Sequence, residues 1–192
     1  VSGTGNVTIT SDTASADVSA SVGSISTTGS FTVQSLQADD ATVAATVTGT
    51  TSVGSLVVTN ATETSAADTI TLTLTGNATV TGTTGVTAGG LAGGGTTATL
   101  NVDGASNTFG GLVTITGGAG NAANDASIVL SGAATTFTTG LTLTDGASGQ
   151  ALLLADGTVA QTITGTILGD GDITVDNAAG ALFHHDRQNL AR

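Results

Sequence analysis

The chain of 192 residues has 14 acidic residues (13 Asp and one Glu) but only two Arg and no Lys, which gives a formal net charge of −12. Nucleic acid is excluded as a partner because phosphate binding needs a basic surface. No run of 18 apolar residues occurs, which excludes a transmembrane helix, and there is no Cys for disulfides. Aromatic residues make up only 2 % of the chain, so Val, Leu, Ile, Ala and Thr must fill any core. Such small side chains suit a thin interior between β-strands.

Short segments of alternating apolar and polar residues follow one another from the N-terminus, and this period of two is typical of β-strands. We expect the early strands at residues 5–10, 18–22, 29–33, 43–47, 54–58 and 70–74. The Gly-rich stretch 88–95 interrupts the pattern and is the one candidate linker. Alternation then continues through residues 98–116, 126–144, 152–155 and 163–175.

The strands belong to a repeat. Residues 98–119 recur without a gap as residues 126–147, 28 positions later, and Gly-led segments elsewhere recur at 25 positions. A period of 25–28 residues predicts an architecture in which each unit buries its apolar face against its neighbours. We therefore expect one all-β solenoid over residues 1–181, in which equivalent residues stack in columns, followed by a non-repetitive tail at 182–192. Two β-sandwich domains that divide at 88–95 are the alternative.

Two segments, LNVDGASNTFGGLVTI at 100–115 and IVLSGAATTFTTGLTL at 128–143, resemble the autotransporter-associated β-strand repeat of bacterial surface proteins. Gly104 and Gly132 occupy the first glycine position of that repeat, and Phe109 and Phe137 occupy its aromatic position. Residues 161–180 are similar to the Gly-Asp-Gly strands of the same family, so that the resemblance extends over residues 98–180. It implies a right-handed parallel β-helix on the outside of a bacterium, and it implies no catalytic residues.

Acidic residues near the end of the repeat are candidate calcium ligands. Asp170 and Asp172 lie in a Gly-rich turn and Asp176 follows it, and carboxylates in such a turn supply the hard oxygen ligands that calcium prefers. Calcium is thus the one cofactor that the sequence suggests. The alternative is a tight turn that uses Asp and Gly for their backbone freedom.

The tail differs in charge from the rest of the chain. Residues 182–192 contain both Arg and one Asp, whereas residues 1–181 contain 13 acids and no basic residue. Arg187 and Arg192 are therefore expected to lie against the acidic surface of a neighbouring copy. Leu182, Phe183 and Leu190 would supply apolar anchors.

These features favour a structural protein over an enzyme, because no Ser lies near both a His and an acid in a catalytic motif. We expect a cell-surface protein that self-associates into an extracellular layer or filament, through its strand edges or its C-terminal tail. A rigid stalk or passenger segment of a bacterial adhesin is the alternative. Cell-surface glycans are a further candidate partner.

Overall fold

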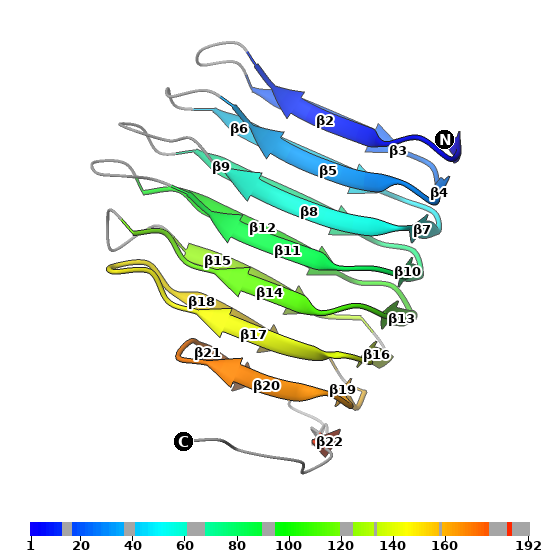
Figure 1. Ribbon diagram of the computed structural model, residues 1–192. Helices are drawn as coiled ribbons and strands as arrows, with labels where there is room; N and C mark the ends of the chain where they lie inside the picture. The colour runs from blue at the N-terminus through cyan, green and yellow to red at the C-terminus, as the bar shows by residue number, and fades with distance from the viewer. Residues whose placement is uncertain are drawn as a thin grey trace.

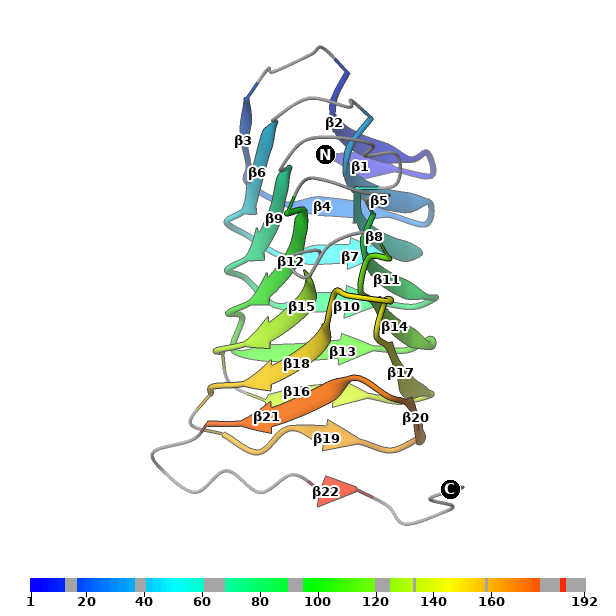
Figure 2. The same cartoon turned by 90° about the vertical axis from the view of Figure 1, so that its left-hand side faces the viewer.

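The computed structural model describes residues 1–12, 17–36, 41–60, 68–89, 95–119, 125–132, 134–157, 159–176 and 184–185. In these ranges the chain forms only strands and turns, which wind around one axis into a right-handed solenoid (Figures 1 and 2). No helix of these ranges is long and apolar enough to cross a membrane.

Each turn of the solenoid contributes one strand to each of three parallel sheets. Sheet 1 contains β1 (Ser2–Gly3), β4 (Ile25–Thr27), β7 (Thr51–Val53), β10 (Ala78–Val80), β13 (Ser106–Phe109), β16 (Ala134–Phe137), β19 (Thr162–Ile163) and β22 (His184–His185). Sheet 2 contains β2 (Val7–Ser11), β5 (Ser30–Ser35), β8 (Ser55–Asn60), β11 (Thr84–Ala88), β14 (Val113–Thr116), β17 (Gly140–Thr144) and β20 (Thr166–Gly169). Sheet 3 contains β3 (Val18–Val22), β6 (Thr42–Val47), β9 (Thr69–Leu74), β12 (Thr97–Val102), β15 (Asp125–Leu130), β18 (Ala151–Ala155) and β21 (Asp172–Val175).

Within the described ranges, sheets 2 and 3 each have seven strands, which correspond to seven turns, and β22 adds one more strand to sheet 1. The sheet register pairs Phe31 with Leu56, 25 positions later, and Leu100 with Ile128, 28 positions later. The predicted solenoid and its repeat length are therefore confirmed. The two-sandwich alternative is wrong, because all three sheets continue from the first turn to the last and β11 and β12 belong to the same turn.

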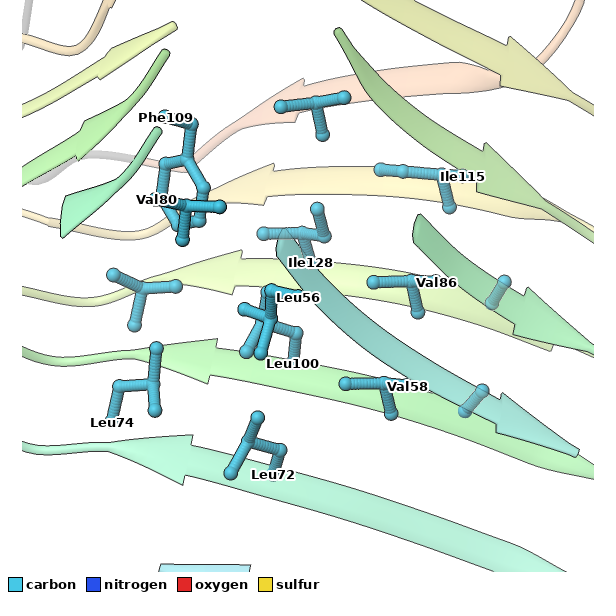
Figure 3. Packing of buried hydrophobic residues seen from close by; sticks show 14 of the residues in the cluster. Leu56, Val58, Leu72, Leu74, Val80, Val86, Leu100, Phe109, Ile115 and Ile128 are labelled. Carbon is cyan, nitrogen blue, oxygen red and sulfur yellow. The ribbon is translucent and has the colours of Figure 1, made fainter. Parts of the chain in front are cut away.

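The core is a set of columns that run along the axis. Every second residue of a strand points inward, as in the alternating burial of β8, β12 and β15. Figure 3 shows such side chains converging on one interior from all three sheets, among them Leu72, Val80 and Ile115. Each fully buried Leu, Ile or Val stabilises the fold by roughly 1.5–3 kcal/mol through its removal from water.

The columns predicted from the internal repeat are present. Phe109 pairs with Phe137, and their rings stack with centroids 5.3 Å apart and planes inclined by 16°. Such stacking adds about 0.5–1.5 kcal/mol beyond the burial of the rings. Ile115 pairs with Leu143, and Val102 pairs with Leu130 in the same way.

A column of glycines forms the corner between sheets 3 and 1. Gly104 lies next to Gly76, and Gly132 lies next to Gly104, so close that a Cβ on either would meet the carbonyl oxygen of the glycine in the preceding turn. The turn between β20 and β21 needs a glycine for a different reason, because Gly169 has a φ of +106°.

Candidate functional site

The three Asp residues predicted to bind calcium lie at the last turn of the solenoid. Asp170 follows β20, Asp172 begins β21 and Asp176 follows it, and all three side chains are exposed. Among the described residues, no three Asp, Glu, His or Cys side chains gather closely enough to hold a metal ion. Calcium at this turn stays a prediction.

The carboxylate of Asp170 has a structural contact instead. Its Oδ1 accepts a hydrogen bond of 2.9 Å from the backbone N–H of Asp145, one turn away. Two other carboxylates make a similar contact, but with the following turn: Oδ1 of Asp125 accepts from the N–H of Gln150 at 2.9 Å, and Oδ1 of Asp17 accepts from the N–H of Thr42 at 3.0 Å. These carboxylates therefore satisfy backbone donors of the adjacent turn, at the ends of the sheet 3 strands or beside them.

Two substitutions separate this contact from metal binding. Asp170→Asn keeps a carbonyl oxygen that accepts the N–H of Asp145, whereas Asp170→Ala removes the acceptor. If the contact is structural, thermal melting of Asp170→Asn is expected to match the parent and that of Asp170→Ala to fall slightly. If Asp170 ligates calcium, added calcium raises the melting temperature of the parent, and both variants lose this rise. Each protein is therefore melted with added calcium and with excess chelator.

The tail residues proposed for assembly, Leu182, Phe183, Arg187, Leu190 and Arg192, lie outside the described residues, and their role stays a prediction. The described part of the tail is β22, which pairs in parallel with β19 through Thr162 and His184 and through Ile163 and His185. The backbone of a segment expected to be non-repetitive thus adds a strand to sheet 1. Sequence reasoning missed this strand because two residues are too few to show alternation.

A buried polar corner lies between sheets 2 and 3 in turns two to four. It consists of four fully buried residues: Ser35, Asn60, Asp68 and Thr96. Asn60 pairs with Ser35 in the sheet, and Asp68 accepts the backbone N–H of Ala41 at 2.7 Å. The sequence contained a signal for Asn60, because it continues the inward positions Leu56 and Val58 at the same spacing of two.

Asn60 is the unusual member of this corner, because neither its carboxamide oxygen nor its nitrogen has a hydrogen-bond partner in the described part of the chain. Burial of such a group without a partner costs about 1–3 kcal/mol. Asn60→Leu has a similar length and no polar atoms to desolvate. We therefore expect it to raise the free energy of unfolding by about 1–3 kcal/mol, measured by urea denaturation.

Asn107→Leu is the matched control for that substitution. Asn107 is also buried, but its Oδ1 accepts from the N–H of Ala78 at 3.0 Å and its Nδ2 donates to the carbonyl of Gly104 at 2.8 Å. Its replacement leaves two buried backbone groups unsatisfied and is expected to lower stability. A loss of stability in both variants would show that the Asn60 carboxamide has partners.

A small cavity opens at the N-terminal end of the rod. Its volume is about 120 Å³, and it lies between Val1, Asn6 and Thr27, with no Asp, Glu or His among its lining residues. The N-terminal amine donates a hydrogen bond of 2.8 Å to the carbonyl of Ser24. A cavity of this size and lining has room for a few water molecules.

Both ends of the rod expose apolar side chains. In the last turn Leu168 and Val175 are 49 % and 43 % exposed, and Ile167 and Ile173 are half-buried. In the first turn Val22 and its inward-facing neighbours are also half-buried.

Comparison with protein-family models, with curated protein sequences and with solved structures finds no match.

Proposed function

We propose that this is a structural cell-surface protein that self-associates into an extracellular layer or filament. The observation that supports this most is the exposure of inward-facing apolar residues, together with unpaired strand edges, at both ends of the described rod. Apolar surface at a strand edge favours association with another chain.

The sides of the rod have a different character. A column of hydroxyl residues runs along the outside of sheet 1: Ser2, Ser26, Ser52, Thr79, Thr108, Thr136 and Thr162. A second column of mostly Thr residues, including Thr59, Thr87 and Thr116, follows sheet 2. These two columns are polar, and the net charge of −12 makes parallel rods repel one another. Association through the ends is consequently favoured over association through the sides.

The location outside a bacterial cell is supported by the resemblance of residues 98–180 to repeats of surface proteins and by the Thr- and Gly-rich composition without Lys or Cys. A rigid stalk of an adhesin is the second candidate, because a solenoid holds its ends apart without a binding site of its own.

Electron microscopy of the purified chain, in buffers of low and high salt and with calcium, tests the proposal. An ordered layer or fibres with an axial repeat equal to the length of one rod are expected. Separate rods of uniform length under all of these conditions would contradict self-association and support the stalk.

A further inference from the structure

The two ends of the described solenoid expose the same kind of surface. The partly buried apolar residues that pack on the core all lie in the first or last turn: Val7, Ile9, Val18, Val22, Ile167 and Ile173. Each of them points inward and is partly exposed because a turn packs on only one side of it. Val175, also inward-facing, is 43 % exposed for the same reason.

The strands at these ends also have unused hydrogen-bonding edges. Among the described residues, β2 pairs only with β5 and β3 only with β6, and β20 pairs only with β17 and β21 only with β18. One edge of each of these four strands therefore lacks a strand partner within the described ranges. Such edges are templates for pairing with another chain.

We infer that the partner of each end is a second copy of this chain, with β2 and β3 of one copy paired in parallel with β20 and β21 of the other. The inference rests on the self-association proposed above and specifies its contact. The contact is head to tail, because turn one of one copy meets turn seven of the next. Heterologous contacts of this kind extend into open filaments rather than closing into dimers.

The columns of the core fix the register of the contact. Val7 begins the sheet 2 column that ends at Ile167, so Val7 of the second copy continues the column when it lies next to Ile167 of the first. In sheet 3, Val22 begins the column that ends at Val175. One placement satisfies both sheets at once, with the spacing of about 4.8 Å that separates turns within the rod.

Sheet 1 behaves differently at this contact. At the end of the rod β22 pairs with β19, the position that β1 of a second copy would take. The contact therefore depends on sheets 2 and 3, and β22 competes with the incoming β1. Deletion of residues 182–192, which removes β22, is expected to leave assembly at least as efficient as in the parent.

The same register brings acidic groups together. Asp17 precedes β3 by one residue and Asp170 precedes β21 by two, so the two carboxylates become neighbours across the contact. Their repulsion is expected to weaken stacking at about 0.01 M salt, where the Debye length is about 30 Å. Asp17→Asn keeps the acceptor for the N–H of Thr42 and removes the charge. It is expected to assemble at a lower protein concentration than the parent at low salt, and at the same concentration at about 1 M salt.

The decisive experiment uses Val22→Lys and Val175→Lys in the full chain, each of which places a charge in one end surface. Each variant alone is expected to be monomeric by analytical ultracentrifugation. An equimolar mixture is expected to form dimers and nothing larger, because it contains one intact copy of each end. Ser21→Lys and Thr174→Lys, exposed and outward-facing on the same strands, are the controls and should assemble like the parent. Circular dichroism and thermal melting establish that all four are folded.

Three results would overturn the contact while leaving the proposed function intact. They are fibres or layers formed by both Lys variants as readily as by the parent, dimers formed by Val175→Lys alone, and loss of assembly on deletion of residues 182–192. The second result indicates a head-to-head contact and the third a contact through the tail. A parent chain that stays monomeric at every salt and calcium concentration would instead refute the proposed function and the contact with it.

Discussion

Leu130→Asp is expected to unfold the solenoid, whereas Val129→Asp, one residue earlier in β15, is expected to leave it folded. Leu130 is 1 % exposed and lies between Val102 and Ala155 in its column. A carboxylate there has no partner for its charge among the described residues, which costs about 3–5 kcal/mol in addition to the lost burial of Leu. That is a large part of the roughly 5–15 kcal/mol by which a typical domain is stable.

Val129 provides the control because it carries the same substitution on the opposite face of the same strand. It is only half-buried and lies between Asn101 and Leu154 on the outside of sheet 3. Circular dichroism and thermal melting compare the two variants with the parent. Parent-like melting of Leu130→Asp, or a reversal of the two results, would mean that the register of β15 is shifted by one residue, which exchanges its faces.

The centre of the fold could be predicted from the sequence because two consecutive turns there have the same length. When the spacing between paired residues stays the same, as it does from Leu100 and Ile128 to Phe109 and Phe137, the sequence repeat is also the register of the sheet. The prediction weakens toward the ends, where turn lengths change. In the last turn Leu152 pairs with Asp172, a much shorter separation, because the chain turns sharply between β20 and β21.

The polar residues were harder to interpret than the apolar ones. A carboxylate in a Gly-rich turn suits a metal ion and a backbone N–H equally well, and only the relative position of adjacent turns shows that Asp170 reaches the N–H of Asp145. The buried position of Asn60 follows from simple alternation, but its lack of partners among the described residues depends on its neighbours in the corner. Alternation therefore predicts which side chains point inward and leaves undetermined what they meet there.

Gly104→Val is expected to lower the free energy of unfolding by about 1–3 kcal/mol or more, because a side chain at this position overpacks the corner between sheets 3 and 1. A Cβ on Gly104 would meet the carbonyl oxygen of Gly76 and would lie 2.7 Å from Oδ1 of Asn107. Neither obstacle is free to move. The first is backbone, and the second holds the N–H of Ala78.

Gly85→Val is the matched control, since Gly85 lies within β11 and a Cβ there meets no atom of the described chain within 4 Å. Its sheet neighbours are Val57 and Thr114, so a β-branched side chain completes an outward-facing column and is expected to stabilise the strand by about 0.5–1 kcal/mol. Urea denaturation of both variants gives the two changes on one scale. The pair distinguishes a glycine required by close backbone approach from one that is not. Equal midpoints for Gly104→Val and the parent would show that adjacent turns stand further apart at this corner, and the tight stacking of the glycine column would then be wrong.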